Sequence, residues 1–125
     1  MPYNSPPPPL AISDDLPILQ KMVEAYKSWH NFLPHFPRLS RYTLGTKIDT
    51  IFTELLELTL LAKYSDKNSK LLLINKAIAK LDCLKFFLQI AWEIKALDNK
   101  KFTHLSQPLI EIGRMLGGWR KQLQK

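Results

Sequence analysis

Apolar residues recur at alternating spacings of four and three positions along three long stretches of the chain. In the second stretch, expected to be a helix from about Arg41 to Tyr64, this apolar seam consists of Leu44, Ile48, Ile51, Leu55, Leu58 and Ala62. The same spacing returns near the C-terminus in Leu105, Leu109, Ile112, Leu116, Trp119 and Leu123. It is the heptad rhythm of helices that bury one stripe against one another. No stretch alternates as a half-buried strand does, so we expect an all-α fold.

Four helices joined by short loops account for the pattern from residue 13 to residue 125. The first helix begins at Ser13, a candidate N-cap with two aspartates in the following turn. Its expected core face consists of Leu16, Leu19, Val23, Tyr26 and Leu33. The loop "FLPHFPRLS" separates it from a second helix over about 41–64, and the loop "YSDKNS" separates that helix from a third over about 70–97. A fourth helix follows over about 101–122. Long helices with short connections predict an up-and-down antiparallel four-helix bundle over residues 13–125.

Residues 1–12, "MPYNSPPPPLAI", fall outside the helical pattern. The run from Pro6 to Pro9 favours the polyproline II conformation, which makes no internal hydrogen bonds. We therefore expect an extended or disordered arm before the bundle. A plain tail and a ligand for a proline-binding partner are both compatible with this composition.

The third helix carries two apolar seams instead of one. The first seam is Ala77, Leu81, Leu84, Leu88 and Ala91, and the second is Ala79, Cys83, Phe86 and Ile90, extended by Leu72 and Ile94. At 100° per residue the two seams lie roughly 140° apart, so this helix must be buried on two sides. It either sits deep in its own bundle or contacts another subunit. A four-helix bundle has no central helix, which favours a homo-oligomer. The candidate interface residues are Leu72, Cys83, Phe86, Phe87, Ile90 and Ile94.

Positive charge is concentrated at the C-terminal end of the chain. The net charge is +7, and residues 99–125 contain six lysines and arginines against one acid, Glu111, which gives a local charge of +5. Such a run is commonly a solvated face. Its asymmetry here favours contact with phosphates, through electrostatics that weaken as salt is added.

The last helix contains an unusual stripe of small residues. Gly113 and Gly117 are four positions apart and lie beside the core seam, with Arg114 and Lys121 just beyond them. Glycine inside a helix costs about 1 kcal/mol relative to alanine. We interpret the stripe as a place where another helix or a ligand backbone comes close. The alternative is that the helix ends near Leu116 with Gly117 as its C-terminal cap.

The sequence offers little catalytic chemistry. The single cysteine, Cys83, excludes an intrachain disulfide and a cysteine-based zinc site, and its leucine-rich flanks suggest a small buried hydrophobe. The three histidines are scattered, with His35 expected in a solvated loop, and neither a Gly-rich phosphate loop nor a nucleophile elbow is present. We expect Trp29 and Trp92 in the core. The prediction is a protein that is not an enzyme, with no cofactor and no metal.

Targeting signals are not evident in the sequence. The N-terminus does not combine a basic start with a long apolar stretch, as a secretory signal does. No apolar run approaches the roughly 18 residues of a membrane span. We therefore expect a cytoplasmic protein with no membrane partner.

Three segments resemble the accessory variability determinant (Avd) proteins of diversity-generating retroelements. They are "FPRLSRYTLGTKIDTIFTELLELTLLA" (36–62), "LDCLKFFLQIAWEIKAL" (81–97) and "EIGRMLGGW" (111–119), and the resemblance covers about residues 20 to 122. It implies a four-helix bundle that assembles as a ring-like homopentamer with a basic surface. It also implies an accessory subunit that binds the retroelement's reverse transcriptase, template RNA and DNA, and supports mutagenic retrohoming without being the polymerase.

The resemblance points to particular basic residues. Lys85 stands where a basic residue is usual, whereas Gln89 replaces the arginine expected one turn later. Arg38, Arg41 and Arg114 match the family's motifs, although Arg41 is equally compatible with capping or bridging helices within the bundle. The candidates for binding nucleic acid or reverse transcriptase are Arg38, Arg41, Lys85, Arg114, Arg120 and Lys121.

A second functional interpretation comes from related four-helix proteins encoded in ribosomal-RNA intervening sequences. These relatives share the Phe-Pro-basic loop but continue into a small-residue helix that contains Asn and ends in a Glu-Gly pair. The sequence "TIFTELLELTLLAK" stands there instead and favours the Avd branch. The alternative function is therefore a structural, oligomeric RNA-binding protein with no reverse-transcriptase partner.

Overall fold

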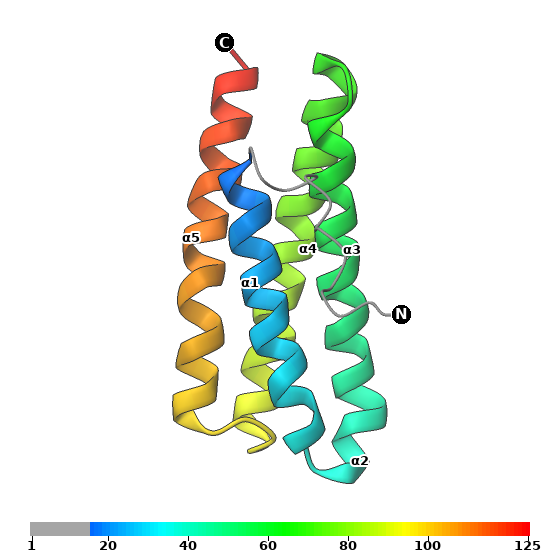
Figure 1. The fold of residues 1–125 in the computed structure, drawn as a ribbon, viewed down its shortest axis with the longest axis vertical. Coiled ribbons are helices and arrows are strands. Elements are labelled where there is room, and N and C mark those ends of the chain that lie inside the picture. The colour runs from blue at the N-terminus through cyan, green and yellow to red at the C-terminus, as the bar shows by residue number, and fades with distance from the viewer. Residues whose placement is uncertain (1–15) are drawn as a thin grey trace, which may run out of the picture.

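The computed structural model describes residues 16–125, and four long helices dominate this part of the chain (Figure 1). They are α1 (Pro17–Phe32), α3 (Thr46–Lys63), α4 (Lys67–Glu93) and α5 (Asn99–Leu123). The helices pack antiparallel, with α1 beside α3, α3 beside α4, α4 beside α5, and α5 beside α1. The prediction of an all-α antiparallel bundle is confirmed. The Ser13 cap and residues 1–12 lie outside the described residues.

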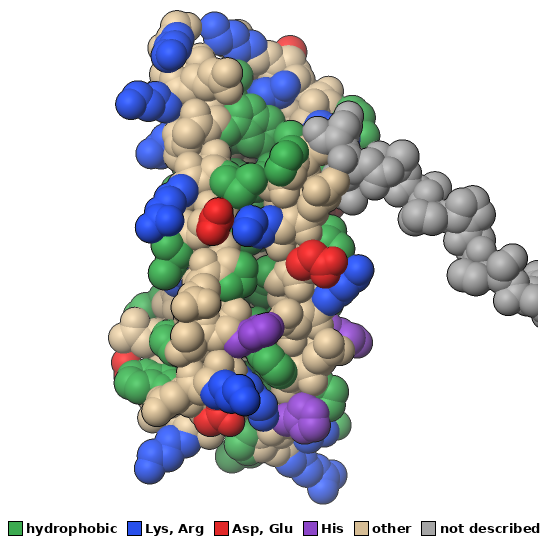
Figure 2. Space-filling model, turned by 60° about the vertical axis from the view of Figure 1, so that its left-hand side comes forward, with side chains coloured by type: hydrophobic (Ala, Val, Ile, Leu, Met, Phe, Trp, Pro, Cys, Tyr) green, Lys and Arg blue, Asp and Glu red, His purple; other side chains and the backbone are tan. Residues whose placement is uncertain are grey.

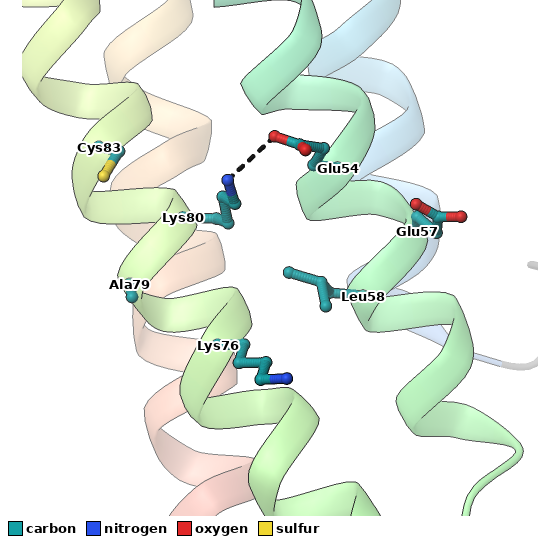
Figure 3. A pocket seen from close by; sticks show the side chains of 7 residues that line it. All are labelled: Glu54, Glu57, Leu58, Lys76, Ala79, Lys80 and Cys83. Carbon is teal, nitrogen blue, oxygen red and sulfur yellow. Dashed lines mark hydrogen bonds and ion pairs between the residues drawn. The ribbon is translucent and has the colours of Figure 1, made fainter.

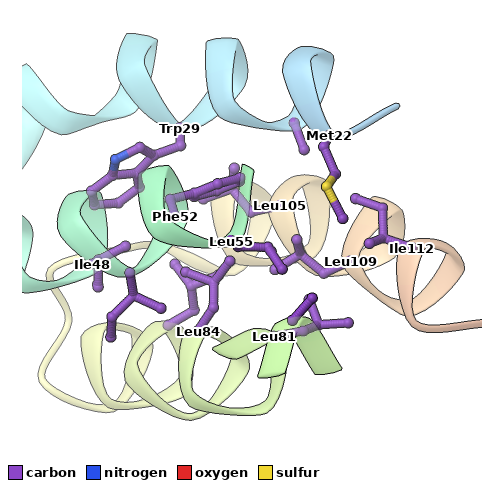
Figure 4. Packing of buried hydrophobic residues seen from close by; sticks show 14 of the residues in the cluster. Met22, Trp29, Ile48, Phe52, Leu55, Leu81, Leu84, Leu105, Leu109 and Ile112 are labelled. Atoms are coloured by element: carbon purple, nitrogen blue, oxygen red, sulfur yellow. The ribbon is translucent and has the colours of Figure 1, made fainter. Parts of the chain in front are cut away.

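The core runs along the length of the bundle between the helices (Figure 4). The predicted seams of α3 and α5 point into it, with Ile48, Leu55 and Ile112 fully buried. The predicted face of α1 is partly wrong, because Met22, Ala25 and Trp29 are buried while Val23, Tyr26 and Leu33 are only half-buried. The prediction that Trp29 lies in the core is confirmed. Its ring packs edge-to-face on that of Phe36, with ring centroids 5.4 Å apart.

A polar contact ties α1 to α3 beside this apolar core. The Tyr26 hydroxyl and the Trp29 indole N–H both donate to Oδ1 of Asp49, at 2.8 and 3.0 Å. Burial and the adjacent carboxylate raise the pKa of the Tyr26 phenol above 10. One carboxylate therefore satisfies two aromatic donors at the edge of the core and helps to fix how the two helices pack.

The loop between α1 and α3 is more helical than its prolines suggest. A 3₁₀ turn (Leu33–His35) is followed by α2 (Arg38–Ser40), a π-helical turn η2 (Arg41–Gly45) and then α3 without a break. Gly45 is buried in this turn, and a Cβ atom there would lie 2.8 Å from Cδ1 of Leu33, so a larger residue would require the leucine side chain to shift. This continuous helical segment begins at Arg38, so the predicted helix start at Arg41 is three residues late. His35 is exposed, as predicted.

The remaining turns are closed by aspartate caps. Asp66 accepts a 2.9 Å hydrogen bond from the backbone N–H of Ser69, so α4 begins at Lys67 and not at Lys70. Asp98 accepts from the N–H of Lys101 at 2.8 Å and starts α5 two residues earlier than predicted. Between them α4 ends at Glu93, four residues before the predicted end, and Lys95 adopts a left-handed φ of 66°.

Candidate nucleic-acid and partner interface

The two apolar seams of α4 lie in opposite environments. The first seam is fully buried in the bundle, with Leu81, Leu84 and Leu88 each at most 1% exposed. The second seam lies on the outside of the described chain, and we refer to it as the outer stripe: Leu72, Cys83, Phe86, Ile90 and Ile94. Leu72, Phe86 and Ile94 are 57%, 60% and 54% exposed. Among the helices of residues 16–125, α4 packs chiefly against α3 and α5, and this described part of the chain leaves most of the stripe exposed.

Cys83 and Phe87 differ in burial from one another. Cys83 is exposed in the single chain, so the prediction of a small buried hydrophobe is wrong there, while its place in a subunit interface stays a prediction. Phe87 is half-buried and packs against the core, with its ring 5.5 Å from that of Phe86 in an edge-to-face contact. Phe87 therefore lies between the core and the outer stripe, and it contacts the stripe through Phe86.

A shallow groove of about 440 Å³ runs beside the stripe between α3 and α4 (Figure 3). Lys80 and Glu54 form an ion pair of 3.0 Å across it. Leu58 points from α3 toward α4, and Cys83 lies where the groove meets the outer stripe. Its lining combines three apolar residues with four charged ones, Glu54, Glu57, Lys76 and Lys80, so a mixed surface adjoins the outer stripe on the α3 side.

Basic side chains gather on the outer side of α5. Arg114 and Lys121 are both exposed and lie seven residues apart on this helix. Figure 2, which turns the α5 side of the molecule forward, shows lysine and arginine side chains toward the two ends of this side, and no lysine or arginine lies on α5 between Lys101 and Arg114. The concentration of charge predicted from the sequence thus lies on a solvent-facing helix.

The two glycines of the predicted stripe have different surroundings. A Cβ on Gly113 would lie 3.3 Å from Cδ2 of Leu81 and 3.4 Å from Nζ of Lys85, so this glycine lets α4 of the same chain approach α5. A Cβ on Gly117 would meet nothing within 4 Å. The alternative that Gly117 caps the helix is wrong, because α5 continues to Leu123.

The other basic candidates are divided between two places. Lys85 is half-buried beside Gly113, and Nη1 of Arg120 lies 3.5 Å from Oδ1 of Asn75, so both side chains lie where α4 and α5 face each other. Arg38 and Arg41 lie at the opposite end of the bundle (Figure 1). Arg38 is exposed, whereas Arg41 closes the loop by donating from Nη2 to the carbonyls of Pro34 and Phe36, at 2.8 and 3.1 Å. The structure thus gives Arg41 a role within the bundle.

Sequence patterns missed several surface features. Trp92 is 40% exposed and not a core residue; its indole N–H donates to Asn99 at 2.6 Å, and its ring stacks on Phe102. Leu39 and Tyr42 are 84% and 70% exposed on the α2–η2 segment. The prolines of the "FPRLS" segment led us to predict an irregular loop. A helix continuing through this segment would have predicted that both side chains face solvent.

Within residues 16–125, no group of three or more His, Cys, Asp or Glu side chains is arranged to hold a metal ion. Nor does any helix in this part of the chain have the length and apolar character of a membrane span.

Fold and surface together define a small antiparallel four-helix protein with an exposed apolar stripe on one helix and a basic outer side on the next. A model of the bAvd-like family matches residues 16–123. The chain therefore belongs to this family of Avd-like proteins of diversity-generating retroelements, which confirms the resemblance found in the sequence. The family consists of accessory proteins that are generally non-catalytic. No curated protein matches the chain significantly.

Proposed function

We propose that the protein is an accessory subunit of a diversity-generating retroelement, which binds the reverse transcriptase, template RNA and cDNA and supports mutagenic retrohoming. The observation that carries this proposal is the bAvd-like match over residues 16–123, which spans both the outer stripe and the basic side of α5. The subunit contributes binding surfaces, and the polymerase chemistry belongs to its partner.

Self-association is the first part of the proposal. The outer stripe exposes more than half of each of Leu72, Phe86 and Ile94, and burying such side chains typically gains about 1.5–3 kcal/mol each. A contact between copies, with the ring-like homopentamer of the family as the assembly, would remove this surface from water. The exposed Cys83 then becomes a small apolar contact within the interface.

Binding of nucleic acid is the second part. Arg114 and Lys121 present their charges to solvent on α5, and Lys85 and Arg120 lie beside the contact between α4 and α5. Each phosphate neutralised by such a side chain releases condensed counterions, so the affinity falls steeply with salt and depends little on sequence. A ring of subunits repeats the same basic patch around the assembly and strengthens its field.

Docking of reverse transcriptase is the third part. Gly117 leaves open space on α5 beside these basic residues, where a partner helix can approach closely. Gly113 does not serve this purpose, because α4 already occupies its side of the helix.

A charge-neutral triple variant tests the proposal. We expect Lys85→Gln/Arg114→Gln/Lys121→Gln to stay helical and to keep its assembly state, but to lose RNA binding and retrohoming. The control Lys27→Gln/Lys47→Gln/Lys67→Gln removes the same three charges from exposed positions on α1, α3 and the start of α4, and should keep both activities.

Three outcomes separate the functional alternatives. Full retrohoming by the triple variant would contradict the role assigned to the basic residues. Equal losses in the two variants would mean that net charge matters and its position does not. An assembly that binds RNA but never associates with a reverse transcriptase would favour the structural RNA-binding function.

A further inference from the structure

A groove with a volume of about 380 Å³ opens between the beginning of α1 and the end of α5. The α1 side consists of the first three described residues of the chain, Leu16, Pro17 and Ile18. The α5 side consists of Met115, Gly118, Trp119 and Gln122. The groove is therefore located where residues 1–15, which precede the family match, join the bundle.

The α5 wall of this groove is open and partly aromatic. A Cβ on Gly118 would meet nothing within 4 Å, so backbone can come close to the helix there. Trp119 is half-buried, and the ammonium of Lys70 lies 5.9 Å from its ring centroid. Grooves lined by aromatic rings suit proline-rich segments, whose extended conformation loses little entropy on binding.

The charges beside the groove are complementary to those of residues 1–15. On α5, Arg114 is four residues before Gly118 and Lys121 is three residues after it, so both flank the open position, and both are exposed. Residues 1–15 contain two aspartates, Asp14 and Asp15, and no lysine or arginine. These carboxylates come directly before Leu16, which is itself part of the groove wall.

We propose that residues 1–15 dock in this groove of their own chain, with the proline-rich part against Trp119 and Gly118 and the aspartates toward Arg114 and Lys121. Because the segment is continuous with the groove wall, its effective concentration there is high, and even weak contacts suffice. The docked segment covers two of the basic side chains and competes with phosphates for them; this second consequence rests on the proposed function.

Photo-cross-linking in the full chain tests the docking directly. With p-benzoyl-phenylalanine in place of Ile12, illumination should link position 12 to residues 115–122 of the same chain. The product should migrate as a monomer on a denaturing gel, and mass spectrometry should locate the link. Gly118→Leu should reduce this product several-fold without loss of helix content, because the leucine occupies open space in the groove.

The same experiment can overturn the proposal in two ways. A link to any other face, or no link at all, would show that the segment does not occupy the groove. A covalent dimer would show that the segment docks on another copy and not on its own chain.

Nucleic-acid affinity tests the competition separately. Asp14→Asn/Asp15→Asn should bind single-stranded DNA several-fold more tightly at low salt than Glu24→Gln/Glu57→Gln, which adds the same charge at exposed positions on α1 and α3. Equal affinities would overturn the competition even if the cross-link forms. DNA binding by none of the variants would contradict the proposed function, while the cross-link would still decide the docking.

Discussion

The inner and outer sides of α4 are similar in sequence but opposite in environment. Leu84 and Leu88 face the bundle and are at most 1% exposed, whereas Phe86 and Ile94 face away from it and are more than half exposed. Packing of the described helices accounts for only the first pair, because within residues 16–125 α4 packs chiefly against α3 and α5 on its two flanks. An apolar side that folding leaves uncovered indicates a second event, which we propose is assembly.

The inner side should give the largest effect on folding. We expect Leu84→Ala to lower the free energy of unfolding by about 2–5 kcal/mol, because it removes buried methyl groups and leaves a cavity. Phe86→Ala on the outer side should change the intrinsic stability of a dissociated chain by less than about 0.5 kcal/mol. Urea unfolding at several protein concentrations separates folding from assembly. Equal losses in dissociated chains would break the distinction between the two sides.

The outer side should give the largest effect on assembly. We expect Phe86→Asp to reduce the mass measured by light scattering to that of the 14.5 kDa chain, because it places an unpaired carboxylate in the proposed apolar contact. Helix content by circular dichroism should remain. Leu39→Asp, which changes a leucine that is 84% exposed on α2, is the matched control and should leave the mass unchanged. A wild-type protein that is monomeric at micromolar concentration would remove the assembly proposal.

The polar contact between α1 and α3 should give an intermediate, pH-dependent effect. Tyr26→Phe removes the hydrogen bond to Asp49 and should cost about 1 kcal/mol near neutral pH. Because folding raises the pKa of Tyr26, its stabilising contribution is complete below pH 10 and is lost as the pH rises through the higher folded-state value. Between these values the wild type should lose stability that the Phe variant does not. If the free energies of unfolding of the two proteins change in parallel from pH 9 upward, this account is contradicted.

The smallest effects should come from the two glycines of α5. Gly117→Ala should raise the free energy of unfolding by up to about 1 kcal/mol, because alanine favours a helix and the added Cβ meets nothing. Gly113→Ala should gain less or lose stability, since its Cβ would lie 3.3 Å from Leu81. Thermal unfolding should rank the two variants in that order.

We expect Gly117→Leu to fold but to fail in a pull-down with reverse transcriptase, whereas a variant that unfolds would place Gly117 in an internal contact.

Much of this fold followed from local patterns that any packed helix must satisfy. Leu105, Leu109, Ile112 and Leu116 needed only their heptad spacing to be assigned to the core, and all are at most 1% exposed. Helix ends were less predictable, because the caps at Asp66 and Asp98 depend on side-chain conformations that periodicity does not report. The buried face of α1 was displaced for a related reason: Tyr26 turns toward Asp49, a partner 23 residues away.

By itself, the sequence determined the all-α class, the doubled seam of α4, the basic C-terminal helix and the resemblance to Avd, because these depend on spacing, composition and motifs along one chain. Only the tertiary structure decided that Gly113 contacts α4 while Gly117 is open, and that Arg41 closes a loop while Arg114 faces solvent. Residues of one type and similar spacing differ in this way because their surroundings come from other helices, and the relative rotation of packed helices is set by all of their side chains together.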